Sequence, residues 1–411
     1  MTTLARRVVS HNHDVVFISL LDGERSVQAA GLNFIPCGVK EYPKGSLNEW
    51  LVLLSKLQGE EALQTTMRNV ARRTEAMLNS LPAILTEAAV DAVVIDTVLF
   101  YVELAPISLD LPYVHVSNAL HCDYSGYTPI CLYGWPHATT PAATTRNREG
   151  VKNFLKRLEP TLTVAKTYAG SIGVKADWDN PYATLSKLAW ISQTPREFDF
   201  DSSHWPSQFH HTGPFHDGFG RTPVDFPWNQ LSGEPLVYAS MGTMMNGIAD
   251  VYRVIGTAAA QVKGIQLVLS IGDQISPKEI GLLPANTIVV KRAPQLQLLK
   301  YASVCITHGG LNTVLESLAQ GVPQVAIPIN VDQPGVAARI AEKKTGLFLP
   351  FKELNESRLS FLLDQVLNNP IYRDNARHFQ KVIAQTDGLS EAARLLERAF
   401  ETPRSPHKRY R

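Results

Sequence analysis

Short runs of consecutive Val, Ile and Leu recur along the chain, and each is followed by a longer segment with apolar residues at helical spacing. The clearest runs are DVVFISL (14–20), VDAVVIDTVLF (90–100), LPYVHVSN (111–118), PLVYASMGT (235–243), IQLVLSIG (265–272), NTIVVKR (286–292), ASVCITHGG (302–310) and PQVAIP (323–328). Continuous apolar runs are typical of parallel strands covered by helices on both faces. The pattern therefore predicts an α/β protein built on parallel sheets.

Three stretches depart from this rhythm or lie at its ends. Residues 2–9 hold Leu4 and Val8 at helical spacing, and the region from 354 to 400 reads as helical. A long amphipathic region from 47 to 89 is expected to break at Pro82, because proline removes a helix hydrogen bond. Residues 121–145 are rich in Gly, Pro and aromatic residues, which predicts a long loop-like insertion.

The length of 411 residues is too great for one ordinary domain, and two α/β domains of about 200 residues each are expected. The economical arrangement is two Rossmann-like parallel sheets facing each other across a cleft. The expected boundaries are an N-terminal domain at 1–214, a linker at 215–233 that is rich in Gly, Pro and Asp, a C-terminal domain at 234–385, and a helix at 386–411 that packs back towards the N-terminal domain.

The composition argues against several functional classes of protein. Lys plus Arg (39) nearly balances Asp plus Glu (38), which argues against a nucleic-acid surface. The four cysteines form no CxxC pair, as expected for reduced thiols in a cytoplasmic protein. No uninterrupted apolar run reaches about 18 residues, so no membrane span is expected. The first thirty residues lack the pattern of a secretory signal.

The segment CITHGGLNT combines a strand, a glycine turn and a helix start. Gly309 and Gly310 let the backbone approach an anion, and His308, Asn312 and Thr313 are potential donors to phosphate oxygens. A lone His-Gly-Gly sequence is more often a structural turn.

Glu316 lies one helical turn after Asn312, where a carboxylate can accept from a ribose diol. In IPINVDQPG, Asp332 and Gln333 can bracket sugar hydroxyls. Gly242 and Thr243, in a third glycine turn, could contact a diphosphate. Anion donors followed by a diol acceptor describe a nucleotide diphosphate better than a free phosphate.

The spacing of APQ, HGGLNTVLES, GVP and DQ within residues 293–333 resembles the donor-binding signature of inverting UDP-dependent glycosyltransferases with two Rossmann-like domains, the GT-B type. The resemblance spans most of the chain and is weaker in the first half. It implies that Ala293, Pro294 and Gln295 lie beside the uracil. It further implies that His308, Asn312 and Thr313 hold the diphosphate, Glu316 the ribose, and Asp332 with Gln333 the sugar.

Two details qualify this resemblance. Arg292 stands where many members have a tryptophan that stacks on the base, and a guanidinium plane can also stack there. Asp199 and Asp201 in FDFD form a DxD pattern that chelates a metal in a different glycosyltransferase fold. They follow ISQTPRE, far from the phosphate turns, so neither a metal nor another cofactor is expected.

Transfer to a hydroxyl needs a base, which in the resembling family is a histidine in the loop after the first strand. Asp96 matches the aspartate that orients this histidine, but the histidine itself is absent, and Met1 falls inside the first helix. We therefore expect the N-terminal sheet to lack its first strand, and we expect the natural protein to carry a further upstream segment. His115 and His121 are possible substitutes, although a core or loop histidine is the more common role.

The expected function is inverting transfer of a hexose, with glucose as the default, from a UDP-sugar to a lipophilic small molecule. Tyr124, Tyr127 and Trp135 could line the acceptor pocket, or they could anchor a surface loop to the sheet. The competing interpretation is a catalytically silent nucleotide-sugar-binding homologue or an auxiliary protein that supports a partner enzyme, because the general-base histidine is absent. A nicotinamide dehydrogenase is disfavoured because no G-x-G-x-x-G follows a strand with an acid about 20 residues later. We expect a monomer or a weak dimer.

Overall fold

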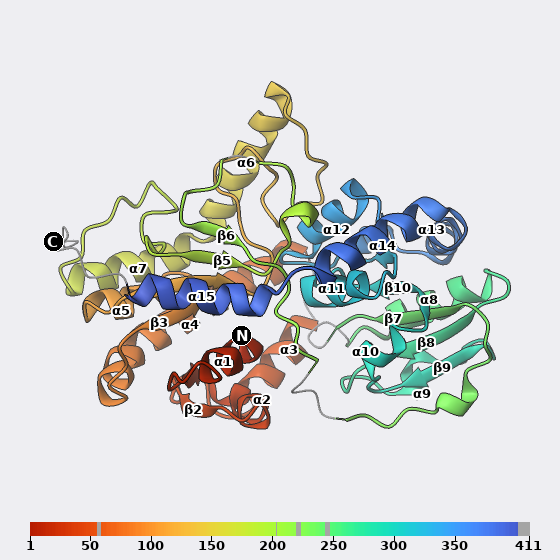
Figure 1. The fold of residues 1–411 in the computed structure, drawn as a ribbon, viewed down its shortest axis with the longest axis horizontal. Coiled ribbons are helices and arrows are strands. Elements are labelled where there is room, and N and C mark those ends of the chain that lie inside the picture. Colours follow the sequence, from red (N-terminus) through yellow and green to blue (C-terminus); the bar gives the residue numbers. More distant parts are fainter. Residues whose placement is uncertain (56–58, 203, 219–222, 243–246, 402–411) are drawn as a thin grey trace.

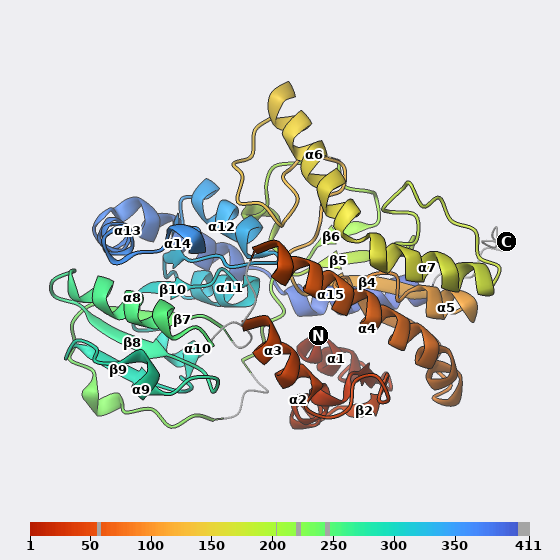
Figure 2. The same cartoon turned by 180° about the vertical axis from the view of Figure 1, so that it is seen from behind.

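The computed structural model describes residues 1–55, 59–202, 204–218, 223–242 and 247–401 of the chain. The two halves of the sequence form two α/β lobes that lie side by side (Figures 1 and 2). β1–β6 belong to the N-terminal lobe and β7–β12 to the C-terminal lobe. All strand pairs are parallel, so the predicted α/β class with two parallel-sheet domains is confirmed.

The C-terminal sheet has six strands in the order β12-β11-β10-β7-β8-β9. This is the doubly wound order, in which the chain starts at the centre and fills one side and then the other. β7 to β11 fall within the apolar runs predicted as strands, whereas β12 was not predicted. Their bounds are β7 Leu236–Ser240, β8 Gln266–Ser270, β9 Thr287–Val290, β10 Ala302–Thr307, β11 Gln324–Ala326 and β12 Gly346–Phe348.

The N-terminal strands form two sheets. β1 pairs only with β2, and a four-stranded sheet follows in the order β3-β4-β5-β6; no hydrogen-bonded ladder joins the two sheets within the described ranges. The bounds are β1 Val16–Ser19, β2 Asn33–Pro36, β3 Val93–Asp96, β4 Tyr113–Ser117, β5 Trp190–Ser192 and β6 Phe209–His211.

Helices cover both faces of the sheets. In the N-terminal lobe they are α1 Thr2–Val9, α2 Glu24–Ala29, α3 Ser46–Ser55, α4 Gly59–Glu87, α5 Leu104–Ser108, α6 Pro141–Arg157 and α7 Glu159–Ser171. In the C-terminal half they are α8 Ala249–Ala260, α9 Pro277–Ile280, α10 Gln295–Leu298, α11 Leu311–Ala319, α12 Gln333–Glu342, α13 Glu356–Asn368, α14 Pro370–Ala384 and α15 Gly388–Glu401. Short 3-10 turns span Leu21–Gly23, Arg196–Phe198, Trp228–Gln230 and Phe351–Glu353.

The last helix lies against the N-terminal lobe. α15 runs beside α1 in Figure 1, and its apolar face packs with Leu4 of α1 and with Val114 and Val116 of β4 in one buried cluster. The contact explains why Leu4 and Val8 recur at helical spacing near the start of the chain. The segment assigned to the linker connects β6 to β7, and residues 219–222 of it lie outside the described ranges.

Two local predictions were wrong. α4 runs through Pro82 without a break, because Leu78, Leu81 and Leu85 are buried on one face of the helix and hold both halves in line. The lost backbone donor at Pro82 affects one hydrogen bond only. The insertion at 121–145 is irregular only as far as Thr140, which caps α6 by accepting from the N–H of Ala143.

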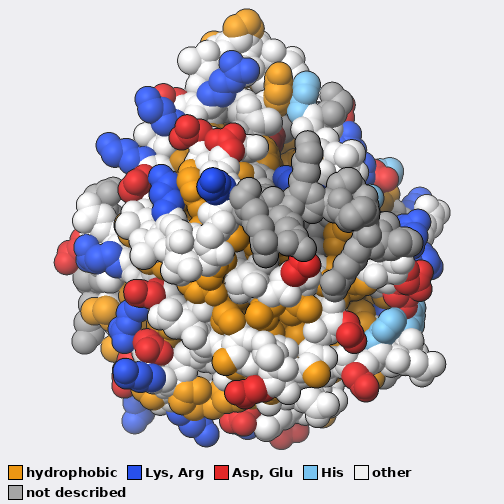
Figure 3. All heavy atoms as spheres, turned by 90° about the vertical axis from the view of Figure 1, so that its left-hand side faces the viewer, with side chains coloured by type: hydrophobic (Ala, Val, Ile, Leu, Met, Phe, Trp, Pro, Cys, Tyr) orange, Lys and Arg blue, Asp and Glu red, His pale blue; other side chains and the backbone are white. Residues whose placement is uncertain are grey.

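The surface of the N-terminal lobe carries no dominant charge on the face shown in Figure 3, where acidic, basic and apolar side chains are interspersed. Among the described helices, none combines the length and apolar character that a bilayer crossing requires.

Candidate functional site

The two central strands of the C-terminal sheet end side by side in glycine-containing turns. β7 and β10 are hydrogen-bonded neighbours, and Ser240 pairs with Thr307 at their carboxyl ends. The strand order reverses between them, because β8 and β9 continue on one side and β11 and β12 on the other. Ligands of doubly wound sheets bind at this reversal. Gly242 follows β7 and His308 follows β10, so two of the predicted turns meet at this point.

The imidazole of His308 is held between two glycines. A Cβ atom on Gly242 would lie 2.6 Å from Cε1 of the ring, and one on Gly310 would lie 2.5 Å from Nε2. Neither position can therefore carry a side chain while the ring stays in place. Burial lowers the pKa of His308 to about 4, so the ring is neutral near pH 7 and has one N–H to donate.

Helix α11 begins directly after this turn. Its N-cap is Gly310, and no side chain caps it. The first-turn N–H groups of a helix lack intrahelical partners and carry the positive end of the helix dipole. Asn312 is exposed and Thr313 half-buried in that turn. The backbone and side-chain donors at this helix start can together donate to an anion with several oxygens.

A carboxylate lies one turn further along α11. Glu316 is 3% exposed, and the amide Nε2 of Gln295 donates to its Oε2 at 2.6 Å. Oε1 of Gln295 accepts from the hydroxyl of Tyr238 at 3.0 Å. The Gln295 side chain is thus oriented by the sheet and in turn orients Glu316, which suits this carboxylate to accept from a diol.

Asp332 and Gln333 open the next helix and lie beside the phosphate turn. A Cβ atom on Gly309 would lie 3.2 Å from the backbone oxygen of Gln333, so the two predicted groups are adjacent. Oδ2 of Asp332 accepts from the N–H of Leu120, in the N-terminal lobe, at 2.9 Å. Burial raises the pKa of Asp332, and this N–H and Arg339 oppose the shift.

The amide of Gln333 is bound to its own loop. Its Oε1 accepts from the N–H groups of Ile329 and Asn330 at 2.8 and 3.2 Å. Val331 just before the pair has φ 54°, a strained conformation for a β-branched residue. The loop therefore holds Asp332 and Gln333 in an imposed conformation.

The proposed base-binding segment starts the short helix α10. Ala293 and Pro294 are half-buried before it. Arg292 is exposed and pairs with Asp273, with Nε 2.9 Å from Oδ2. This pairing fixes the orientation of the planar Arg292 guanidinium at the surface, and stacking on a base requires such a fixed orientation. Thr243 lies outside the described residues.

The comparisons with known proteins concern the family and the fold. The UDP-glucoronosyl and UDP-glucosyl transferase family matches residues 222–385, a range that contains all the predicted donor-site residues. Zeaxanthin glucosyltransferase of Pantoea ananas is 26% identical over 404 residues, which cover 98% of this chain and 93% of that protein. The chain is a glycosyltransferase of the UDP-glycosyltransferase type.

Other similarities extend over almost the whole chain. The 4'-demethylrebeccamycin synthase of Lentzea aerocolonigenes is 23% identical over 412 residues, which cover 97% of this chain and 95% of that protein. The crystal structure of CalG4, the calicheamicin glycosyltransferase, matches with a TM-score of 0.74 at 21% identity, covering 98% of this chain and 95% of that one. The expected GT-B fold is thereby confirmed.

Asp96 ends strand β3 in the N-terminal lobe of this glycosyltransferase. Its Oδ1 accepts from the N–H of Val98 at 3.3 Å. Burial raises the pKa of Asp96, and the opposing effects come from this N–H and from nearby positive groups, including Arg73. The start of α1 lies close by, because the amino group of Met1 donates to Oδ1 of Asn118 after β4 at 3.2 Å.

The candidate substitute histidines belong to the core. Nδ1 of His115 accepts from the N–H of Ser186 at 3.1 Å, and its Nε2 lies 3.6 Å from Glu103. His121 is 2% exposed and is hydrogen-bonded through both ring nitrogens to Ser192 and Asp199, each at 2.9 Å. Neither imidazole is placed to take a proton from an acceptor.

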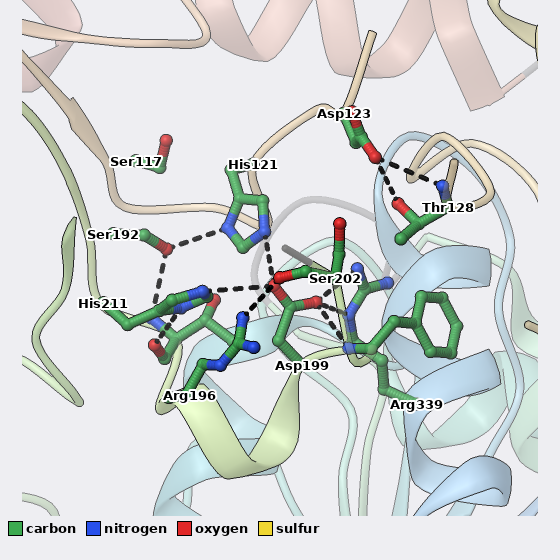
Figure 4. Close-up of polar contacts among 12 residues, drawn as sticks. Ser117, His121, Asp123, Thr128, Ser192, Arg196, Asp199, Ser202, His211 and Arg339 are labelled. Carbon is green, nitrogen blue, oxygen red and sulfur yellow. Dashed lines mark hydrogen bonds and ion pairs between the residues drawn. The ribbon is translucent and has the colours of Figure 1, made fainter. Parts of the chain in front are cut away.

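The two aspartates of the DxD pattern lie in different environments. Asp201 has a side chain that is 95% exposed and pairs with Arg196. Asp199 is buried at the centre of a charged cluster between the lobes (Figure 4). Its Oδ1 lies 2.6 Å from Nη2 of Arg339 on α12, and its Oδ2 is bound by His121. The pair thus does not form a chelate in this structure, and Asp199 instead connects the lobes.

The aromatic residues of the 121–140 loop pack mainly on their own surroundings. Tyr124 stacks on Phe154 of α6, and Tyr127 stacks on His204 with ring centroids 3.5 Å apart. Trp135 stacks on Tyr133 at 3.9 Å. These contacts correspond to the anchoring alternative for the loop, and they do not bring Tyr124, Tyr127 and Trp135 together around one pocket.

Sequence reasoning missed two residues at the lobe interface. Arg339 is 1% exposed, and Gln193, after β5, is fully buried. Gln193 donates to Asn312 at 2.9 Å across the interface. A signal for Arg339 existed in GVAARIAEKK, because its arginine lies three residues after Val336 on the buried face of the helix. A polar residue directly after the buried strand at 190–192 was the corresponding signal for Gln193.

Proposed function

We propose that the protein transfers a hexose from a UDP-sugar to a hydroxyl of a lipophilic small molecule, with inversion at the sugar carbon. The observation that carries this proposal is that three groups of residues converge at the carboxyl end of the C-terminal sheet. They are the His308 turn with the start of α11, the carboxylate of Glu316, and the pair Asp332 and Gln333. A nucleotide sugar carries its diphosphate between the ribose and the sugar. The His308 turn is likewise next to both other groups, because Glu316 lies one turn further along the helix that this turn starts, and the backbone of Gln333 lies beside Gly309.

The assignment of the donor site depends on which groups face the negatively charged diphosphate. The neutral imidazole of His308 supplies an N–H next to the start of α11, so a diphosphate meets donors without a competing carboxylate in that turn. The structure of the glycosyltransferase VinC in complex with dTDP matches this chain with a TM-score of 0.68 at 19% identity, covering 97% of this chain and 95% of that one. The competing donor nucleotide to test is therefore dTDP. Glu316 favours UDP, because a deoxyribose has one hydroxyl fewer to donate to it.

In the proposed reaction the acceptor oxygen attacks the anomeric carbon from the face opposite the diphosphate. The new C–O bond forms as the bond to the diphosphate oxygen breaks, and the acceptor proton passes to a base. The negative charge that develops on UDP is stabilised by the N–H groups at the start of α11 and by His308. Asp96 is proposed to occupy the position of the aspartate that orients the base histidine in the resembling family, a histidine that this sequence lacks. Asp332 with Gln333 is proposed to hold the hexose, with glucose as the first candidate.

The acceptor assignment rests on the relatives and on the lobe arrangement. Two relatives are a zeaxanthin glucosyltransferase and a 4'-demethylrebeccamycin synthase. Asp332 contacts Leu120 across the interface, so the sugar site faces the N-terminal lobe, where an acceptor would bind. A lipophilic alcohol or phenol is therefore the proposed class.

Titration calorimetry and a transfer assay test the proposal. We expect UDP to bind more tightly than dTDP, and NAD not to bind. We expect UDP-glucose to be consumed in the presence of members of a panel of carotenoid diols, phenols and macrolides, with the opposite anomeric configuration in the product. Asp332→Asn should lower transfer while leaving UDP affinity unchanged. Failure of both UDP and dTDP to bind, or a product with retained configuration, would contradict the proposal.

A further inference from the structure

Gln193 has an amide whose orientation is fixed by the backbone. It follows β5 in the N-terminal lobe and is 0% exposed. Its Oε1 accepts from the N–H of Phe215 at 3.3 Å, and its Nε2 donates to the carbonyl oxygen of Asn118. A backbone N–H can only donate and a backbone carbonyl can only accept. The Gln193 amide therefore cannot turn over without losing both bonds.

This fixed amide determines the orientation of a second one in the other lobe. The remaining Nε2 hydrogen of Gln193 is directed to Oδ1 of Asn312 at 2.9 Å. Because Oδ1 of Asn312 faces Gln193, its Nδ2 group faces away from that contact. Asn312 is exposed in the first turn of α11, so the donor end of its amide is the end available to a ligand there.

We propose that Gln193 is a positioning residue that holds Asn312 with its N–H₂ group directed at the donor diphosphate. The inference rests on the proposed function, because it assumes a diphosphate at the start of α11. In the opposite orientation, Oδ1 of Asn312 would face the anion and repel it. An unconstrained exposed amide populates both orientations, so the buried glutamine removes the repulsive one before the donor binds.

The alternative is that Gln193 merely connects the lobes and stabilises the fold. The two roles differ in what depends on them. A structural role affects uridine and UDP alike and persists without the Asn312 amide. A positioning role affects only ligands that carry the diphosphate, and it vanishes when Asn312 is truncated.

The experiment is a double-mutant cycle on the full chain, with Gln193→Met, Asn312→Ala and the double variant, read by calorimetry with UDP and with uridine. Gln193→Met has a similar size and lacks hydrogen-bonding groups, and we expect it to weaken UDP binding by about fivefold. Uridine binding should stay unchanged. In the Asn312→Ala background, Gln193→Met should have no further effect on UDP.

Gln193→Glu provides the sharper comparison. A carboxylate at 193 can only accept, so it turns the Asn312 amide over and presents Oδ1 to the diphosphate. We expect its loss of UDP affinity to exceed that of Gln193→Met, at about tenfold or more. Because the carboxylate also repels the diphosphate directly, Gln193→Glu is measured again in the Asn312→Ala background, where the direct repulsion remains and the loss that acts through the Asn312 amide should disappear. Thermal unfolding of each variant separates this effect from a folding defect.

Three results would overturn the inference: equal losses for UDP and uridine, a Gln193→Met effect that persists in the Asn312→Ala background, or wild-type UDP affinity in the folded Gln193→Met variant. The last result leaves the proposed function intact. If wild-type protein binds neither UDP nor dTDP, the proposed function fails and the inference fails with it.

Discussion

One added methyl group at Gly310 tests whether the His308 imidazole belongs to the donor site. Gly310 has φ −64° and ψ 129°, a conformation that alanine adopts without strain. Gly310→Ala therefore acts only through space. Its Cβ would lie 2.5 Å from Nε2 and 2.7 Å from Cε1 of His308, whereas carbon and nitrogen atoms in contact prefer about 3.5 Å or more. The ring must move by about 1 Å.

A movement of that size removes a hydrogen bond to the diphosphate, because such bonds need donor–acceptor distances of about 2.7–3.2 Å. A hydrogen bond to a charged group contributes about 1.5–3 kcal/mol. We therefore expect Gly310→Ala to weaken UDP binding by at least about tenfold in titration calorimetry. His308→Ala and the His308→Ala/Gly310→Ala double variant should bind UDP equally, because the methyl group has nothing to displace once the ring is gone.

Gly264 offers the matched control. It has φ +67°, and a Cβ there would meet nothing within 4 Å. Gly264→Ala should therefore lower the unfolding free energy by about 1–2 kcal/mol through backbone strain, with UDP affinity unchanged. Wild-type UDP affinity in Gly310→Ala, or an equal loss in Gly264→Ala, would refute the assignment of His308 to the diphosphate.

Two further predictions concern buried charge. Arg339→Met should lower the unfolding free energy, measured by urea denaturation, by about 3–5 kcal/mol, because it leaves the buried Asp199 carboxylate without its main partner. A loss below about 1 kcal/mol would contradict the pairing of Arg339 with Asp199 in a buried charged cluster. The second prediction concerns pH. Burial lowers the pKa of His308 from 6.5 to about 4, so between these two pH values the His308 ring is protonated in the unfolded chain and neutral in the folded chain. The unfolding free energy should fall as pH is lowered through this range, and His308→Asn should reduce this slope in denaturation curves at several pH values.

Local patterns predicted the fold because the forces that form it are local in sequence. Buried parallel strands require uninterrupted apolar residues, and the runs at 265–272 and 302–310 became β8 and β10 for that reason. A glycine turn between a strand and a helix also has a local signature, so the position of His308, Asn312 and Glu316 at the start of a helix could be predicted, while their role in the site stays a prediction. The predicted helix break at Pro82 was wrong, because packing of the buried face of α4 outweighed the local tendency of proline to end a helix.

The contacts between the lobes could not be predicted in the same way. Gln193 meets Asn312 across 119 residues of sequence, and Arg339 meets Asp199 across 140. Nothing in the neighbourhood of either residue specifies its partner. A charged residue on the apolar face of α12 indicated burial, but the identity of its partner depends on how the two lobes dock.

Helix α12 shows why these long-range contacts matter for the site. Its N-cap Asp332 is bound to the N–H of Leu120, and two turns later Arg339 is bound to Asp199. Both partners belong to the N-terminal lobe. The N–H of Gly335 on the same helix also donates to the carbonyl oxygen of Cys131 in that lobe at 2.8 Å, so one helix of the C-terminal lobe is attached to the N-terminal lobe at several points. Gln193 adds a further attachment at α11. The groups proposed to hold the sugar and the diphosphate are therefore positioned partly by the lobe that would bind the acceptor. Substitutions in the N-terminal lobe should accordingly change donor binding even where they touch no donor atom.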